Sequence, residues 1–301
     1  HKRPDGDTIG SAVGLCELLR AMGKTAWLLP SLDATKVFQD YLQGRQAPPD
    51  FAPGTVVSVD VASLGLLPAN AAPYQGRIDL AIDHHPSNEF FAQETCLEAD
   101  KAACGEIIWK IADHLGIMNS AIATPLYVAV ATDTGCFVYG NTTPHTHRVA
   151  AALMEQDIPY QALNKRHFRT KSLRRMKLES LILQNMKLYQ EGTVAVAPIS
   201  LAMMAQANAT DDDAEDIAAF LGQIEGVLHS ATIRELRPGE CKISLRTNPN
   251  YLNATATCAR LGGGGHVAAS GCTVRGTVDE AETAILEAIY AQLAEQARTG
   301  L

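Results

Sequence analysis

The segment 78–85 is a mostly apolar run that ends in one carboxylate and two imidazoles. Residues 78–82 have the character of a buried strand, and Asp83, His84 and His85 follow at its end. In open α/β sheets, ligands bind at the edge formed by the carboxyl ends of the strands. Asp and His are rarely buried at such a position without a partner. We therefore expect these three side chains to bind a metal ion or to transfer protons.

Three other places put Asp or His at the boundary of an expected element. Asp60 ends the apolar run 55–59, and Asp133 follows the apolar, helix-length run 122–131. The third place is the opening loop, which leads into a helical pattern and carries His1, Asp5 and Asp7. Because each site lies at an element boundary, we expect all four to converge on one point at the edge of a sheet.

Carboxylates and imidazoles gathered in one pocket repel one another or lose hydration unless a cation neutralises them. Divalent metal ions resolve this conflict. A mixed set of oxygen and imidazole ligands is typical of sites for Mn²⁺, Mg²⁺ or Fe²⁺. It differs from a zinc site rich in thiolates. An Asp shared between two ions would set them about 3.5–4 Å apart, the geometry of two-metal phosphoryl hydrolysis. The pattern therefore predicts a centre with two metal ions.

Composition and charge limit the classes of partner. The chain has 301 residues, 47% hydrophobic and 19% charged, which suggests two domains with a sizeable core. Its formal net charge of −8 argues against a broad basic surface for long nucleic acids but allows small anionic ligands in one pocket. No apolar run reaches the roughly 18 residues of a membrane span. Seven scattered cysteines without a Cys-x-x-Cys pair predict reduced thiols and a cytoplasmic protein.

Apolar runs alternate with helical patterns, which predicts an α/β fold with a mostly parallel sheet. In the first domain we expect strands at 25–29, 55–60 and 78–83 and helices within 97–116 and 122–131. A domain of this kind normally has a strand before its first loop, so we also expect one ahead of His1. A second domain begins near Thr193, with strands at 194–199, 227–235 and 242–246 and helices near 252–261 and 278–297.

Five motifs in order resemble the DHH family of phosphoesterases, over essentially the whole chain. The resemblance lies in His1-x-x-Pro4-Asp5-Gly6-Asp7, in Asp60, in Asp83-His84-His85, in Thr132-Asp133-Thr134-Gly135 with Asn141 after it, and in the glycine run at 262–265 with His266. The two-domain length is most similar to the bacterial members that act as both oligoribonuclease (nanoRNase) and phosphatase of adenosine 3′,5′-bisphosphate, or pAp. The resemblance implies a role for each matching residue.

In that family pattern, His1 and Asp5 would hold one metal ion, and Asp7, His84 and Asp133 would hold the other, with Asp60 bridging them. Asp83 would hydrogen-bond to a metal-binding His and fix its tautomer. His85 would contact the scissile phosphate or protonate the leaving oxygen, so His85, Asp83 and Asp60 form the expected catalytic set. A water activated by both ions would attack phosphorus in line. The expected cofactor is two Mn²⁺ ions, with Mg²⁺, Co²⁺ or Fe²⁺ as alternatives.

A further set of residues is expected to bind the substrate. Gly263, Gly264 and Gly265 let backbone N–H groups approach an anion closely, and His266 adds a donor. Arg246 ends the strand at 242–246 and is expected to clamp a phosphate with two hydrogen bonds. Asn141 joins this set through its place after the fourth motif.

The resemblance implies three parts in the chain. They are a mostly parallel-sheet DHH catalytic domain at 1–158, a helical connector at 159–191, and a smaller α/β DHH-associated domain for substrate binding at 192–301. A cleft between the two domains would limit substrate length, so short oligonucleotides are expected in preference to long ones.

The resemblance implies a hydrolase that cuts short oligoribonucleotides to mononucleotides and pAp to AMP with metal-activated water. The expected partners are short RNA or small nucleotides, not long nucleic acid or a membrane, and a homodimer is one expected assembly. The alternative is a phosphodiesterase for cyclic di-AMP or linear dinucleotides, which needs the same metals. A catalytically silent nucleotide-binding regulator is less expected, because all six candidate metal ligands are present.

Overall fold

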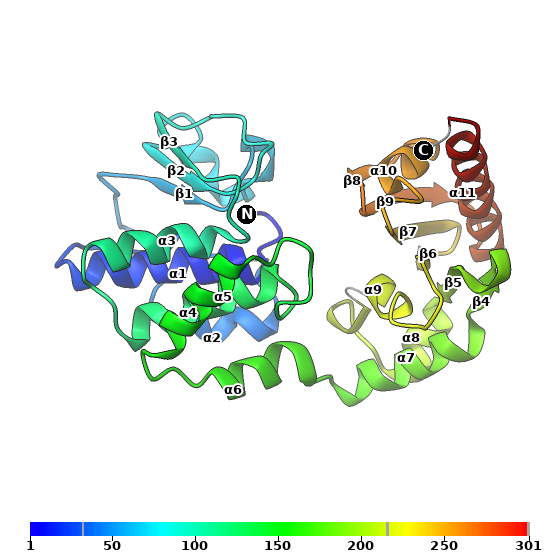
Figure 1. The fold of residues 1–301 in the computed structure, drawn as a ribbon, viewed down its shortest axis with the longest axis horizontal. Coiled ribbons are helices and arrows are strands. Elements are labelled where there is room, and N and C mark those ends of the chain that lie inside the picture. Colours follow the sequence, from blue (N-terminus) through cyan, green and yellow to red (C-terminus); the bar gives the residue numbers. More distant parts are fainter. Residues whose placement is uncertain (32, 215–216, 300–301) are drawn as a thin grey trace. The chain divides into compact units, whose positions relative to one another are not determined.

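The computed structural model describes residues 1–31, 33–214 and 217–299 (Figure 1). The chain divides into two compact units, one ending at Thr170 and the next beginning at Lys171. This boundary lies inside the segment that the sequence assigns to a connector, and the division at 158 and 191 stays a prediction. Within the described residues, none of the helices has the length and apolar character to cross a membrane.

The first unit contains a parallel sheet with strand order β1-β2-β3, as the sequence predicts for its fold class. The strands are β1 (Val57–Val59), β2 (Leu80–Asp83) and β3 (Glu94–Leu97). Val59 pairs with Ile82, so the carboxyl ends of β1 and β2 lie side by side. Asp60 and the Asp83-His84-His85 motif therefore meet at one edge of the sheet.

Helices form the remaining layers of this unit (Figure 1). Next to the sheet lie α1 (Gly6–Ala21) and α3 (Cys104–His114), and beyond them lie α4 (Ser120–Asp133) and α5 (Pro144–Met154). Nine consecutive or near-consecutive residues of α4 are buried, because this apolar helix is surrounded by its neighbours. The shorter helices are α2 (Gln39–Leu42) and α6 (Tyr160–Asn164).

The structure differs from the expectations for this unit in two details. The strand expected at 25–29 is reduced to an isolated bridge between Leu28 and Gln46. The helix expected within 97–116 is confirmed as α3, Cys104–His114, whereas the strand β3 at Glu94–Leu97 was not expected. That strand has an exposed charged residue at its start and lacks a continuous apolar run, so it gives a weak strand signal.

Helices α1 and α4 approach closely because small residues line their contact. A Cβ built on Gly6, Gly10 or Gly14 would overlap a residue of α4, and at Gly10 it would lie 2.4 Å from the carbonyl oxygen of Pro125. These glycines recur every four residues, so they form one stripe along α1. The close approach matters for function because α1 carries Asp7 and α4 ends at Asp133.

Gly10→Ala is expected to destabilise the protein by about 2–3 kcal/mol, because the added methyl group forces two backbones apart. The midpoint of thermal unfolding measures this effect and should fall by several degrees. Gly76→Ala is the matched control, since nothing lies within 4 Å of the Cβ that it would add. Equal midpoints for the two variants would contradict the close contact of α1 with α4.

The second unit contains a six-stranded mixed sheet with order β4-β5-β6-β7-β9-β8. Its strands are β4 (Lys187–Tyr189), β5 (Val194–Ile199), β6 (His229–Arg237), β7 (Glu240–Thr247), β8 (Gly264–His266) and β9 (Ala269–Arg275). Among these six described strands, only β5 and β6 pair in parallel. The strands expected at 194–199, 227–235 and 242–246 correspond to β5, β6 and β7.

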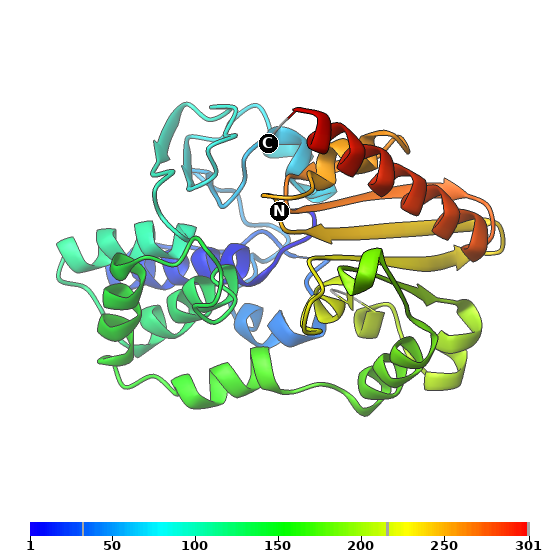
Figure 2. The same cartoon turned by 45° about the vertical axis from the view of Figure 1, so that its right-hand side comes forward.

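Helices cover both faces of this sheet, and strand β5 shows the reason. Val194 and Val196 belong to the core beneath α10 (Ala254–Ala259) and α11 (Val278–Thr299), which lies along the sheet in Figure 2. Ala195, Ala197 and Ile199 point to the other face, toward α7 (Leu173–Asn185), α8 (Leu201–Ala207) and α9 (Ile217–Leu221). A strand buried on both faces is continuously apolar, as residues 194–199 are.

His167 gives the first unit a pH-dependent stability. Its ring stacks on Phe38 with centroids 5.4 Å apart, and its Nε2 lies 2.9 Å from the hydroxyl of Tyr41. Burial, assisted by the charge of Arg166, lowers the pKa of His167 to about 4. An unfolded chain binds this proton below its ordinary pKa near 6.5, whereas the folded protein binds it only near pH 4. The neutral ring therefore stabilises the fold above pH 6.5, and this stability is lost as the pH falls toward 4.

The stability difference between the protein and a His167→Gln variant is expected to shrink by about 1 kcal/mol from pH 7.5 to pH 5, after allowance for the partial exposure of the ring. Glutamine offers Tyr41 an acceptor but does not titrate. Urea unfolding of both proteins at the two pH values measures the difference, and other titrating groups cancel in the comparison. A pH-independent difference would mean that His167 protonates in the folded protein as readily as in the unfolded chain.

Candidate metal centre

Asp7 lies in the first turn of α1 and is buried. Its Oδ1 accepts hydrogen bonds from the hydroxyl of Ser11 (2.8 Å) and the backbone N–H of Gly105 (3.0 Å). Its Oδ2 accepts from the backbone N–H of Cys104 (2.7 Å). The carboxylate of Asp7 thus faces the amino end of α3, where free N–H groups and the helix dipole stabilise negative charge.

Asp60 directly follows β1 and has a left-handed backbone, with φ of 55°. Asp tolerates this region better than most residues, and such strain is often found at functional sites. The hydroxyl of Thr8 donates to Oδ2 over 2.7 Å. Among the described residues, Oδ1 accepts no hydrogen bond although it is buried. It lies 3.5 Å from Nε2 of His84 and 3.6 Å from Nδ1 of His85.

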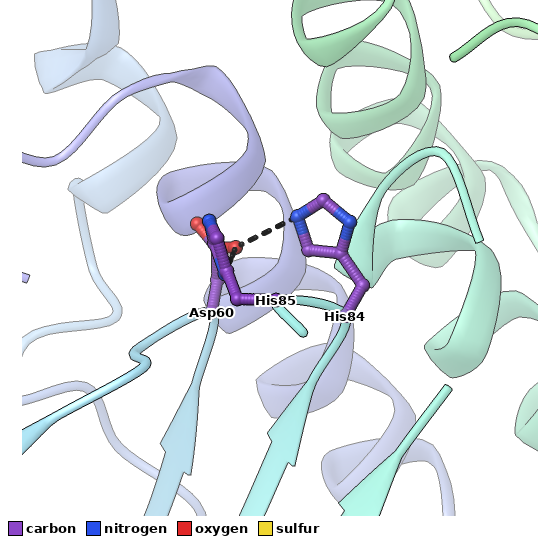
Figure 3. Close-up of side chains that lie close together, drawn as sticks. All are labelled: Asp60, His84 and His85. Atoms are coloured by element: carbon purple, nitrogen blue, oxygen red, sulfur yellow. Dashed lines mark ion pairs between the residues drawn. The ribbon is translucent and has the colours of Figure 1, made fainter. Parts of the chain in front are cut away.

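Figure 3 shows Asp60 facing His84 and His85 at the ends of the neighbouring strands β1 and β2. Nδ1 of His84 lies 3.1 Å from the carbonyl oxygen of Lys101. A carbonyl only accepts, so Nδ1 carries the proton, and in the neutral ring Nε2 has the free lone pair. That Nε2 lies within 3.7 Å of carboxylate oxygens of Asp7, Asp60 and Asp133.

Asp83 binds the second histidine of the motif. Its Oδ1 accepts from Nδ1 of His85 over 2.8 Å and from the backbone N–H of His84, and its Oδ2 accepts from the amide of Asn88 over 2.6 Å. These bonds hold the pKa of Asp83 low despite its burial, and the Asp83 bond raises the pKa of His85. Asp83 therefore orients His85, whereas the carbonyl of Lys101 orients His84.

Asp133 is the last residue of α4, and the following loop folds back onto it. The amide of Asn141 donates to the carbonyl oxygens of Asp133 and Ala102, each over 3.1 Å. Asn141 thereby ties the loop after α4 to the segment before α3. Its expected contact with substrate stays a prediction.

The charges of this cluster are poorly balanced without a cation. Burial and the nearby charges of Asp60 and Asp133 raise the pKa of Asp7 well above its usual range. Burial also raises the pKa of Asp133 to about 6, with Asp60 adding to the effect and His84 opposing it. Burial alone would lower the pKa of His84, but the three surrounding carboxylates outweigh it and raise this pKa to about 10.

These residues fit divalent metal ions. Two overlapping groups, Asp7–His84–Asp133 and Asp60–His84–His85, each bring ligand atoms within 4.8 Å of one another. The buried Oδ1 of Asp60 accepts no hydrogen bond from any described residue, as expected for a group that binds a cation. Carboxylate oxygens with one or two imidazoles form a ligand set suited to Mn²⁺, Mg²⁺ or Fe²⁺.

His1 and Asp5 belong to neither group in the described part of the chain. Nδ1 of His1 lies 3.0 Å from the carbonyl oxygen of Arg3, and Oδ1 of Asp5 caps α1 by accepting from the N–H of Thr8. Burial and the charge of Asp60 raise the pKa of Asp5. The metal-binding role of both residues stays a prediction.

In the second unit, sheet register brings two predicted substrate-binding residues together. Arg246 in β7 pairs with Ala269 in β9, which pairs with His266 in β8. Directly opposed residues point to the same face of a sheet, so Arg246, His266 and, two residues away, Gly264 share one face. The phosphate-binding role of these residues stays a prediction.

The glycines of this segment serve different needs. A Cβ on Gly263 would lie 2.2 Å from the carbonyl oxygen of Gly271, and one on Gly265, whose φ is 148°, would lie 2.7 Å from that of Ala269. Both are therefore required by the close approach of β8 to β9. Nothing lies within 4 Å of a Cβ on Gly264, so its exposed backbone is open to a ligand.

Sequence reasoning missed the residues that hold the ligands in place. Thr8 and Ser11 donate to the candidate ligands Asp60 and Asp7, and Asn88 donates to Asp83, which in turn holds His85. Thr8 and Ser11 lie one and four residues after Asp7, so they belong to the same helix as that ligand. This spacing could have been recognised in the sequence. The carbonyl of Lys101, which orients His84, could not, because every residue has a backbone carbonyl.

Comparison with known proteins adds independent observations. A family model described as the DHH family, N-terminal domain, matches residues 1–130, and a DHHA1 domain model matches residues 191–295. A protein of Thermus thermophilus, described as bifunctional oligoribonuclease and PAP phosphatase NrnA, is 31% identical over 97% of this chain and 88% of its own. A Bacillus subtilis protein of the same description is 25% identical over 91% of this chain and 87% of its own.

A solved structure supports the fold. An exopolyphosphatase-related protein from Bacteroides fragilis superposes with a TM-score of 0.81 at 23% identity, covering 96% of this chain and 89% of its own. The two proteins therefore share a fold over nearly their whole length.

Proposed function

Because the chain belongs to the DHH family of metal-dependent phosphoesterases, we propose that it hydrolyses short oligoribonucleotides to mononucleotides and pAp to AMP. The observation that supports this most is the convergence of three carboxylates on Nε2 of His84. The relatives named as oligoribonuclease and PAP phosphatase cover most of the chain, so both domains are shared with them. We propose Mn²⁺ as the physiological metal, with Mg²⁺, Co²⁺ or Fe²⁺ as alternatives.

Asp7, Asp60, His84 and Asp133 would hold the metal ions, and His1 and Asp5 are proposed to complete the ligand set. When bound, the ions would supply Lewis acidity that acidifies a water and offsets the negative charge of the phosphate. The buried ligands are held before substrate arrives, by Thr8 on Asp60 and by the amino end of α3 on Asp7. Such preorganisation lowers the cost of reaching the transition state.

His85 has a different task in this proposal. Its Nδ1 donates to Asp83, so Nε2 is the ring nitrogen that remains for the substrate. The side chain is more exposed than that of His84, which leaves it accessible from solvent. We propose that Nε2 of His85 donates a hydrogen bond to the scissile phosphate or a proton to the leaving oxygen. Asp83 holds the ring in the orientation that this requires.

A substrate panel with Mn²⁺ tests the proposal. It contains RNA of two to five residues, RNA of about twenty residues, pAp, cyclic di-AMP and pyrophosphate, with products followed by chromatography. Mononucleotides from the short RNA and AMP from pAp, both lost in an Asp60→Ala variant, are the expected result. Preferential opening of cyclic di-AMP would favour a cyclic-dinucleotide phosphodiesterase instead. Turnover of none of the five would overturn the enzymatic proposal.

We also propose a cytoplasmic location, supported by the free state of all seven cysteines. The homodimer expected from the resemblance stays a prediction. Sedimentation of the purified protein at micromolar concentration decides between a monomer and a dimer.

A further inference from the structure

The loop after Asp133 is strained in an unusual way. Gly135, Cys136 and Phe137 are three consecutive residues with left-handed backbones, with φ of 56°, 57° and 67°. Glycine adopts this region freely, but Cys and Phe do so at a cost of about 1–2 kcal/mol each. Such strain persists only where the surroundings impose it, and it concentrates at functional sites.

Several contacts impose this turn. The N–H of Cys136 donates to the carbonyl of Ala131 over 2.7 Å, and the N–H of Phe137 donates to the hydroxyl of Thr134 over 3.2 Å. The Phe137 ring stacks on His147 with centroids 5.2 Å apart and packs against the core of the first unit. The core therefore fixes the direction in which the chain leaves the turn.

The turn returns Tyr139 to the residues that follow Asp133. Its N–H donates to the carbonyl of Thr134 over 3.0 Å, and its ring lies on Gly135, where an added Cβ would be 2.4–2.6 Å from three ring carbons. Despite this contact, 57% of Tyr139 is exposed to solvent. The Tyr139 ring therefore contributes little to the hydrophobic core. Its position is nevertheless fixed, because Tyr139 lies two residues after the strained turn 135–137, which follows the candidate metal ligand Asp133.

We propose that Tyr139 is a nucleobase-binding residue, which stacks its exposed ring on a base of the nucleotide whose phosphate lies at the metal centre. This inference rests on the proposed function and adds a subsite to it. Stacking on an aromatic ring contributes about 1–3 kcal/mol per base and tolerates any sequence, because every base has a π-face. Such a contact suits an enzyme that degrades short RNA irrespective of its sequence.

The kinetic test compares Tyr139→Leu with Tyr139→Phe, which keeps the ring. Val138→Ala is the matched control, because Val138 is the neighbouring loop residue and is 79% exposed. The substrates are 5′-phosphorylated diadenylate and two analogues, each with an abasic ribose at one position. The Leu variant is expected to raise KM for the dinucleotide by about 5- to 150-fold, with kcat within about twofold.

The same variant is expected to leave KM unchanged for the one analogue that lacks the stacked base. The Phe variant and the Val138 control should match the unaltered protein on all three substrates. If the Leu variant raises KM equally for all three, or for none, Tyr139 has no role in base binding.

Equilibrium binding separates a failure of this inference from a failure of the proposed function. Titration calorimetry with AMP and with ribose 5-phosphate requires no turnover. The unaltered protein should bind AMP more tightly, and Tyr139→Leu should lower the affinity for AMP to that for ribose 5-phosphate. Tighter AMP binding that survives in the Leu variant, or no preference for AMP in the unaltered protein, overturns the base subsite. Inability to cleave the dinucleotide, by contrast, counts against the proposed function alone.

Discussion

Replacing Asp60 with Asn is expected to lower kcat for short RNA and pAp by about a thousandfold or more. The change keeps the size of the side chain but removes the charge that Oδ1 directs at His84 and His85. It also replaces the carboxylate by an amide at a buried site, where Oδ1 of Asp60 accepts no hydrogen bond from the described residues. Steady-state kinetics with saturating Mn²⁺ measures the loss.

In urea unfolding with a chelator present, the same substitution is expected to change the stability of the metal-free protein by less than about 1 kcal/mol. Asp60 repels Asp5, Asp7 and Asp133 and raises their pKa values, and the neutral amide relieves this repulsion. The amide also loses the attraction of Asp60 for His84 and His85, so the two effects oppose each other. Asp113→Asn, at an exposed position of α3, is the control and should change neither property. An Asp60→Asn protein that keeps more than about a tenth of the activity would place Asp60 outside the reaction centre.

Much of this cluster is predictable because parallel strands end at one edge of a sheet. Apolar runs before Asp60 and Asp83 predict two adjacent strands, and the register of Val59 with Ile82 brings their ends together. Asp133 is similarly marked by the apolar helix before it. In each case the signal is local, because it needs only a periodic pattern and a polar residue where the pattern stops.

The division of labour between His84 and His85 is not predictable in this way. His84 is oriented by a backbone carbonyl, and any residue at position 101 would supply the same atom. His85 pairs with Asp83 because the chain turns sharply after β2, which brings the ring back to the preceding carboxylate. Tertiary geometry therefore decides which histidine faces the three carboxylates.

The second unit shows a similar limit. Arg246 and His266 are 20 residues apart in the chain, and their shared face depends on β9 lying between their strands. The glycine run suggests an anion site from the sequence, but Gly263 and Gly265 serve the packing of β8 on β9. Of these three glycines, only Gly264 has open space beside its backbone, as the predicted anion site requires. Residue type alone does not separate these two uses of glycine.

Removing divalent metal with a chelator is expected to abolish activity and to lower stability together, because the same carboxylates serve both. Asp7 and Asp133 have raised pKa values in the metal-free cluster, so a bound cation relieves an existing repulsion. At a metal concentration of about 100 times Kd, the free energy of unfolding should rise by about 2.7 kcal/mol. Thermal unfolding of the chelated protein, repeated after Mn²⁺ is restored, measures this gain beside the recovery of activity.

Asp60→Asn separates a specific metal effect from a general ionic one. If the ions bind at this centre, Mn²⁺ should stabilise the variant much less than the unaltered protein. A general ionic effect would stabilise both proteins equally, and Ca²⁺ or added salt would reproduce it. Full activity after exhaustive chelation would contradict the metal centre outright.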